Sequence, residues 1–267
     1  MSITRSLLAS DLDGTLIPLQ RDAQRLGEVA QLVAALRERP ELQLAYVTGR
    51  HLSLAEQGIA EVGLPTPDWF VCDVGTSVYH RVDGGFEPDE SYREAMRAAF
   101  GGLSGADVRA AIGEVDGIEL QEEEKQAEFK VSYYTRGRHE PYVQLVQDRL
   151  DTAGAHANLV ASFDPLSERG LLDVLPEGVA KDYAIRYLHE RTGIDAEHLV
   201  YAGDSGNDRA AMLSGFRAIV VGNADAALKH ELQSASVEGG LSERLYFAQQ
   251  PYAAGVLEGL RHFALVG

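Results

Sequence analysis

The sequence has little of three things: cysteine, lysine and long apolar runs. Its one cysteine, Cys72, excludes intrachain disulfides and a thiolate metal site. No apolar run approaches the roughly 20 residues that a membrane-spanning helix needs. Asp11 and Asp13 interrupt the first apolar stretch, so we expect no signal peptide. Together these absences predict a protein of the reducing cytoplasm, with no membrane partner.

Positive charge is also scarce. The 267 residues include 41 acidic and 24 basic side chains, which gives a formal net charge of −17. A field of that sign repels nucleic acid and anionic membranes, and no basic stripe offsets it. A phosphate ester could still bind where a metal ion, a lysine or helix N-termini supply local positive charge. We therefore expect a small-molecule ligand and no nucleic-acid partner.

Strands and helices alternate at both ends of the chain. Apolar strand patterns at 7–10, 42–47 and 69–72, the last running on to 75–76, are separated by helical patterns at 22–38 and 53–62, with Ser53 as the expected N-cap of the second. After Pro176, helices at 179–192, 209–213, from 225 and at 252–263 alternate with strands at 199–202 and 218–221. This rhythm predicts an α/β fold with a doubly wound, Rossmann-like parallel sheet. We expect an exposed loop at 233–241.

The middle of the chain follows another pattern. Helical patterns at 91–100, 104–114 and 140–153 are mixed with short strand patterns at 117–120, 129–135, 156–163 and 171–175. Strands without strict alternation with helices indicate an antiparallel sheet covered on one face. We predict a core domain made of 1–83 and 176–267, with an α+β cap domain inserted at 84–175.

Two acidic clusters follow buried strands of the predicted sheet. Asp11 and Asp13 come after the first strand, and Asp204 and Asp208 come after the strand at 199–202. Because the carboxyl ends of parallel strands meet at one edge, these carboxylates are expected to share a Mg²⁺ ion. The alternative is that they only cap the helices that follow. The presence of both clusters favours the metal site.

Two further residues fit a phosphate group. Thr48 ends the second strand, where its hydroxyl and the amide of Gly49 could bind phosphate oxygens. Lys181 opens a helix, where the helix dipole disfavours a lysine unless it pairs with an anion. The alternatives are a strand-ending turn for Thr48 and a solvated surface lysine for Lys181.

The four motifs Asp11-Leu12-Asp13-Gly14-Thr15, Thr48, Lys181 and 203–208 resemble, in order and spacing, those of the haloacid dehalogenase superfamily. The position of the cap resembles the subgroup with a large α/β cap, which is typical of sugar phosphatases. The resemblance implies that Asp11 attacks phosphorus and that Asp13 moves the proton, with its backbone carbonyl on the metal. It also implies the remaining roles, which are phosphate binding for Thr48, Lys181 and Asn207, and metal binding for Asp204 and Asp208.

Five segments resemble the sucrose-phosphate phosphatases more closely: 46–50, 66–68, 73–79, 130–133 and 173–178. By analogy, the candidate sugar contacts are Arg50, Thr76, Lys125, Gln126 and Lys130. Lys125 lies in an acidic run, so it could equally be a solvated charge. Members that act on sucrose phosphate often have Asn where this chain has Gly14, which leaves related disaccharide and glycosyl-glycerol phosphates open as substrates.

Three functions compete at this point. The first is Mg²⁺-dependent hydrolysis of a sugar phosphate through an aspartyl-phosphate. The second is a sugar phosphomutase, which would need a bisphosphate. The third is a non-catalytic phospho-acceptor switch. The acid at Asp13 argues against a switch, because an acid–base group would speed loss of the aspartyl-phosphate. The predicted cap argues against it as well, since a switch would not need a cap.

Overall fold

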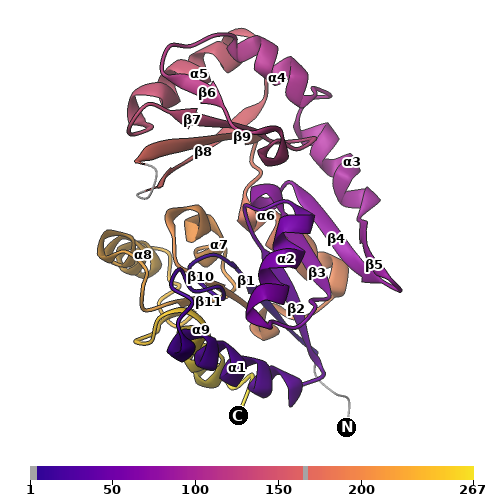
Figure 1. The fold of residues 1–267 in the computed structure, drawn as a ribbon, viewed down its shortest axis with the longest axis vertical. Coiled ribbons are helices and arrows are strands. Elements are labelled where there is room, and N and C mark those ends of the chain that lie inside the picture. The colour runs from indigo at the N-terminus through magenta and orange to yellow at the C-terminus, as the bar shows by residue number, and fades with distance from the viewer. Residues whose placement is uncertain (1–4, 165–167) are drawn as a thin grey trace.

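The computed structural model describes residues 5–164 and 168–267 and arranges them around two sheets (Figure 1). The larger sheet has eight strands in the order β12-β11-β10-β1-β2-β3-β4-β5, and the smaller has four in the order β6-β7-β9-β8. The strands of the larger sheet are β1 Ser6–Ser10, β2 Leu42–Val47, β3 Trp69–Cys72, β4 Ser77–Val82, β5 Gly85–Pro88, β10 Leu199–Gly203, β11 Arg217–Val220 and β12 Leu245–Phe247.

The central strand β1 is buried along its whole length and pairs in parallel with β2 on one side and β10 on the other. From there the chain winds outward in both directions, through β2 and β3 and through β11 and β12. The point where strand order reverses therefore lies between β1 and β10. In open α/β sheets the ligand crevice forms at this point, outside the carboxyl ends of the strands.

Helices cover both faces of the larger sheet. Those on one face are α1 Ala23–Arg37, α2 Leu52–Val62 and α9 Tyr252–His262, and those on the other are α6 Lys181–Thr192, α7 Arg209–Met212 and α8 Ala226–Glu238. The longer helices bury residues at helical spacing, as α1 does with Val29, Leu32, Val33 and Leu36. The predicted doubly wound α/β core is confirmed.

The smaller sheet belongs to the cap. Its antiparallel strands are β6 Ile118–Leu120, β7 Val131–Thr135, β8 Ala157–Asp164 and β9 Arg169–Pro176, accompanied by α3 Glu90–Ala99, α4 Gly105–Ile112 and α5 Glu140–Thr152. Helices α4 and α5 lie on the outer face of this sheet (Figure 1). Its other face is turned toward the carboxyl ends of the core strands.

Strands β4 and β5 form an antiparallel extension at one edge of the larger sheet. Gly85–Pro88 thus pairs with the core sheet, although it lies beyond the predicted start of the cap at residue 84. The domain boundaries remain a prediction, and this pairing supports a start near Asp89, which caps α3.

Three local predictions were wrong. Strand β3 stops at Cys72, where a 3₁₀ turn begins, because Asp73 and Val74 take positive φ values of 54° and 61°. Ser53 lies inside α2, whose N-cap is His51. Helix α8 continues to Glu238 through much of the expected loop, because Leu228, Leu232 and Ser236 extend a buried stripe under its polar face. Among the described residues, no helix is long and apolar enough to cross a membrane.

Candidate active site

Three strand ends bring the predicted catalytic residues together at the crevice. Asp11 follows β1, Thr48 follows β2 and Asp204 follows β10. Backbone bonds continue the sheet past these ends: Asp11 N–H donates to the Ala202 carbonyl at 2.9 Å, and Thr48 N–H donates to the Val71 carbonyl at 2.8 Å. The backbone at the site is therefore fixed by the sheet itself.

A carboxylate cluster lies at the centre of the crevice. One oxygen from each of Asp11, Asp204 and Asp208 lies within 4.8 Å of the others. Burial raises the pKa of Asp204 to about 7, with the charge of Asp208 adding to the effect, and burial also raises the pKa of Asp11. Neighbouring carboxylates repel one another when they ionise, and a divalent cation between them stabilises the ionised form. A few carboxylate ligands, with coordination positions left open for water and substrate, suit Mg²⁺. The donor set therefore fits a magnesium ion.

Lys181 provides the positive charge next to this cluster. Its ammonium group is fully buried and lies 2.6 Å from both Asp11 Oδ1 and Asp208 Oδ1, with Asn207 Oδ1 at 3.3 Å. The two carboxylates keep the pKa of Lys181 above its usual range against the opposing effect of burial. Lys181 is therefore a charged contact of the nucleophile candidate, and the solvated-lysine alternative is excluded by its burial.

Asp208 acts as the scaffold of the cluster. Its Oδ1 accepts hydrogen bonds from Lys181 and from the Tyr201 hydroxyl, and its Oδ2 accepts from the backbone N–H groups of Asp204 and Ser205 and from the Ser205 hydroxyl. These bonds keep the pKa of Asp208 below its usual value, although burial opposes them. The loop that carries Asp204 is therefore folded around the Asp208 carboxylate.

The loop after β1 is fitted to Asp204 from the other side. The Thr15 hydroxyl donates to Asp204 Oδ1 at 3.0 Å, and the Asn223 side-chain amide donates to the Gly14 carbonyl at 2.8 Å. Gly14 has φ +82°, and a Cβ added there would lie 2.4 Å from Asp204 Oδ2. A glycine at position 14 thus gives Asp204 its place in the cluster.

The side chain of Asp13 points away from the carboxylate cluster and toward Arg50. Its carboxylate lies outside the carboxylate cluster and is held by Arg50, whose Nε is 2.7 Å from Oδ2 and whose Nη2 is 2.5 Å from Oδ1. Arg50 also donates to the Leu54 carbonyl. The arrangement leaves the Asp13 carboxylate 45% exposed, at the lining of the cavity described below. Metal binding through its carbonyl remains a prediction.

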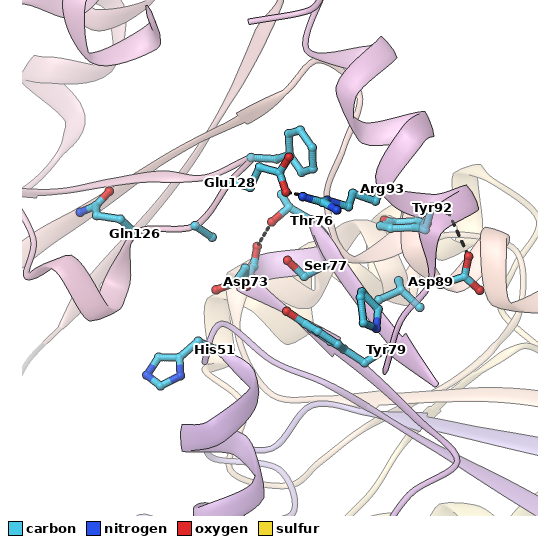
Figure 2. Close-up of a pocket in the computed structure, with 14 residues that line it drawn as sticks. His51, Asp73, Thr76, Ser77, Tyr79, Asp89, Tyr92, Arg93, Gln126 and Glu128 are labelled. Atoms are coloured by element: carbon cyan, nitrogen blue, oxygen red, sulfur yellow. Dashed lines mark hydrogen bonds and ion pairs between the residues drawn. The ribbon is translucent and has the colours of Figure 1, made fainter. Parts of the chain in front are cut away.

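A cavity of about 270 Å³ lies over these groups, between core and cap. Predicted site residues that line it are Asp11, Asp13, Thr48, Gly49, Arg50, Lys125, Lys130 and Asn207. Thr76 and Gln126 line a neighbouring cavity of about 460 Å³ instead (Figure 2). The Gln126 side chain is bonded to the backbone of Gln121 and Ser132, so it braces the cap loop.

Sequence reasoning missed several residues of the site. Thr15, Tyr201 and Asn223 support the carboxylates and their loops, and Ser132 and Asp173 of the cap line the cavity. Thr15 stands in the first motif, so its hydroxyl could have been assigned. Ser132 and Asp173 lie in the segments 130–133 and 173–178 that resemble the sucrose-phosphate phosphatases, so they could also have been named. The contacts of Tyr201 and Asn223 depend on side-chain directions, which no motif in the sequence marks.

Comparisons with known proteins identify the family of the chain. The family model for sucrose-6F-phosphate phosphohydrolase matches residues 4–264. A protein of Nitrosococcus oceani named only as a HAD-like hydrolase is 38% identical over 96% of this chain and 71% of its own length. The mannosylfructose-phosphate phosphatase of Agrobacterium fabrum is 30% identical over 97% of each chain.

A solved structure gives the same fold. The sucrose-phosphatase of a Synechocystis species, determined with sucrose and phosphate, has a TM-score of 0.79 and 26% identity to this chain, covering 98% of this chain and 99% of the other. The match spans both core and cap. The chain belongs to the sucrose-6F-phosphate phosphohydrolase family within the haloacid dehalogenase superfamily.

Proposed function

We propose that this phosphatase hydrolyses the phosphate monoester of a disaccharide or glycosyl compound in the presence of Mg²⁺, with Asp11 as nucleophile. The observation that carries the proposal is the contact of the buried Lys181 ammonium with Asp11 Oδ1 at 2.6 Å, beside a carboxylate cluster suited to a divalent ion. A nucleophilic carboxylate next to a fixed cation can receive a phosphoryl group without charge repulsion.

In the first step, an oxygen of Asp11 forms a bond to phosphorus as the bond from phosphorus to the sugar oxygen breaks. Asp13, in its protonated form, gives its proton to the departing sugar oxygen. Water then attacks the aspartyl-phosphate, and Asp13 takes a proton from that water. Inorganic phosphate leaves, and Asp11 returns as a carboxylate.

The remaining residues hold the phosphoryl group. Asp11, Asp204 and Asp208 would hold Mg²⁺, which supplies positive charge to the phosphate oxygens when bound. In this proposal the Thr48 hydroxyl, the Gly49 amide and Lys181 bind the same oxygens. Supporting it, Thr48 and Gly49 line the cavity, and Asn207 Oδ1 lies 3.3 Å from the Lys181 ammonium. Phosphoryl transfer requires mainly such positioning and charge neutralisation.

The cap supports a sugar as the leaving group. Its wall of the cavity is polar, with Gln121, Glu124, Lys125, Ser132 and Asp173, and such side chains match the hydroxyl groups of a carbohydrate. Arg50 and Lys130 lie in the same cavity and Thr76 and Gln126 beside it, so direct sugar contacts by these four remain predictions. The cytoplasmic location also remains a prediction.

The test is phosphate release from a panel of sugar phosphates that includes sucrose 6-phosphate, mannosylfructose phosphate and a glycosyl-glycerol phosphate. We expect turnover of at least one member, loss of turnover with EDTA and recovery with Mg²⁺. Asp11→Asn should lower turnover by about a thousandfold or more, while the surface control Asp116→Asn should not change it. Hydrolysis of no panel member, or full activity of Asp11→Asn, would refute the proposal. A requirement for a bisphosphate activator would identify a phosphomutase instead.

A further inference from the structure

A buried lysine joins the cap to the phosphate side of the core. Lys130 stands just before β7 of the cap, and its side chain is 4% exposed. Its Nζ lies 3.4 Å from the Gly49 carbonyl oxygen and 3.6 Å from Asp73 Oδ1, both in core loops. A buried ammonium group needs such partners, because an unpaired charge away from water is strongly unfavourable.

Asp73 is presented to Lys130 by a strained turn. Asp73 has φ +54° and Val74 has φ +61°, a conformation that a β-branched residue rarely adopts. The turn is fixed by two backbone bonds, from Asp73 N–H to the Arg50 carbonyl at 3.0 Å and from Val74 N–H to the Thr48 carbonyl at 3.1 Å. The acceptor of Lys130 is therefore attached to the same loop, 48–50, that faces the substrate phosphate.

The contact between Lys130 Nζ and Asp73 Oδ1 is longer than a hydrogen bond. Among the described residues, Asp73 Oδ1 is buried and accepts no hydrogen bond, and Lys130, 3.6 Å from this oxygen, is the main charge that stabilises the Asp73 carboxylate, with smaller contributions from Ser77 and His51. On the cap side, Asp173 of β9 feels the same ammonium charge, which opposes the rise that burial causes in its pKa. One cation thus serves a carboxylate of the core and a carboxylate of the cap.

The pair also stands between the two cavities of the interface. Lys130 and Gly49 line the catalytic cavity, whereas Asp73 lines the larger cavity in Figure 2, together with Tyr79 and Glu128. In that view Asp73 lies between His51 on one side and Thr76 on the other. A movement of the cap against the core therefore changes the boundary that Lys130 and Asp73 form between the two cavities.

We propose that Lys130 is a positioning residue that couples the seating of the cap to the geometry of the phosphate-binding loop 48–50. With the cap seated, its ammonium group contacts Gly49 and Asp73 and fixes the loop in its working position. With the cap lifted, both contacts are lost. The inference rests on the proposed phosphatase activity for its kinetic test, but its structural test is independent of that activity.

The kinetic test compares Lys130→Met, Asp73→Asn and the double variant on two substrates, the preferred sugar phosphate and p-nitrophenyl phosphate. A residue that positions the loop acts on both, so we expect kcat to fall about 10- to 100-fold for each substrate with little change in KM. The double variant should lose no more than the larger single loss, because both changes break one interaction. A loss confined to the KM for the sugar phosphate, or multiplying losses in the double variant, would make Lys130 a sugar contact and overturn the proposal.

The structural test measures the distance between core and cap. Ala30 in α1 and Ala106 in α4 are both exposed, and Cys72 is fully buried, so Ala30→Cys and Ala106→Cys can carry spin labels selectively. In the full chain, Lys130→Met and Asp73→Asn should shift the label distances to longer values. Arg136→Met, which removes an exposed ion pair of the cap, should leave them unchanged. An unchanged distribution in Lys130→Met would overturn the proposal.

One further control and the choice of substitution at Asp73 keep these outcomes separate. Lys130→Arg retains the charge and should restore most of kcat and the wild-type distances. Asp73→Asn suits the positive φ at this position, since Asn tolerates that conformation, and it carries the test if Lys130→Met does not fold. If the wild type hydrolyses neither substrate, the proposed function fails while the distance measurement still decides the role of Lys130.

Discussion

Arg50 holds the Asp13 carboxylate at two points, with Nε 2.7 Å from Oδ2 and Nη2 2.5 Å from Oδ1. The guanidinium group is in turn fixed by the Leu54 carbonyl and packed against α2 at Gly58, where a Cβ would lie 2.3 Å from Nη1. The proposed acid–base group therefore depends on a neighbour that the sequence suggested only as a sugar contact.

Arg50→Met should impair proton transfer. We expect kcat for a sugar phosphate to fall about tenfold or more, because an alkoxide needs a proton from a well-placed acid to leave. The loss for p-nitrophenyl phosphate should be smaller, since its leaving group departs without a proton. Steady-state kinetics on both esters, with the surface variant Arg21→Met as control, measure this difference. Equal losses on the two esters would contradict the role of Arg50 in positioning Asp13.

Lys181→Met should destabilise the fold as well as stop turnover. It leaves the buried carboxylates of Asp11 and Asp208 without their shared cation, which typically costs about 3–5 kcal/mol of the free energy of unfolding. Urea unfolding in EDTA measures the change. Lys125→Met, at an exposed lysine, is the matched control and should stay within about 0.5 kcal/mol of the wild type. A wild-type stability for Lys181→Met would show that the cation is not needed by the fold.

The metal-free protein should lose stability as pH rises from about 4 to about 7. The pKa of Asp204 is about 7 in the folded protein and 3.8 when the side chain is free in water, as in the unfolded chain, so the folded form binds the extra proton across this window. Stability falls with pH wherever the folded state binds more protons than the unfolded state. Added Mg²⁺ should bind with release of that proton, so the rise in Tm caused by Mg²⁺ should grow with pH up to about 7.

Thermal unfolding with EDTA or with Mg²⁺ at several pH values measures both effects. Asp204→Asn lacks the titrating group, so its metal-free stability should fall less across the same range and its response to Mg²⁺ should be weak. A Mg²⁺ response in the wild type that is independent of pH between 5 and 8 would contradict the raised pKa.

Gly14→Ala should weaken metal binding. The new Cβ would overlap Asp204 Oδ2, and displacing a ligand's supporting contacts typically lowers metal affinity or activity about 10- to 100-fold. Gly63→Ala is the matched control, because Gly63 has a similar φ of +75° with nothing within 4 Å of the added Cβ. The Mg²⁺ concentration for half-maximal activity should rise in Gly14→Ala and stay unchanged in Gly63→Ala.

The sequence predicted the part of the site that depends on strand ends. Asp11, Thr48 and Asp204 follow apolar runs that form strands. A parallel sheet brings the carboxyl ends of its strands to one edge, independently of the conformation of the loops. Lys181 was suggested by its place at the start of a helix. The pairings of Arg50 with Asp13 and of Tyr201 with Asp208 depend on side-chain directions across the crevice, and composition and spacing carry no information on those.

The errors in the predicted secondary structure also come from features that the local sequence does not reveal. The residues at 77–88 form an antiparallel edge whose strands are half exposed, so they lack the apolar run that marked the central strands. In α8, Gln233, Ser234 and Glu238 resembled a loop because they form the solvent-facing side of a helix, whereas Ser236 is buried. Local composition predicts well which segments are exposed. It does not distinguish an exposed helix from an exposed loop, because both are rich in polar residues.

The five donors around Asp208 have a consequence for how the enzyme rests between turnovers. Its carboxylate accepts hydrogen bonds from Lys181, Tyr201, Ser205 and the Asp204 amide, so the protein itself orients a ligand of the proposed metal site. We therefore expect Lys181 and the loop 204–208 to keep their positions when the proposed ion leaves. Fluctuations in magnesium concentration should switch the rate on and off without a cycle of unfolding and repair.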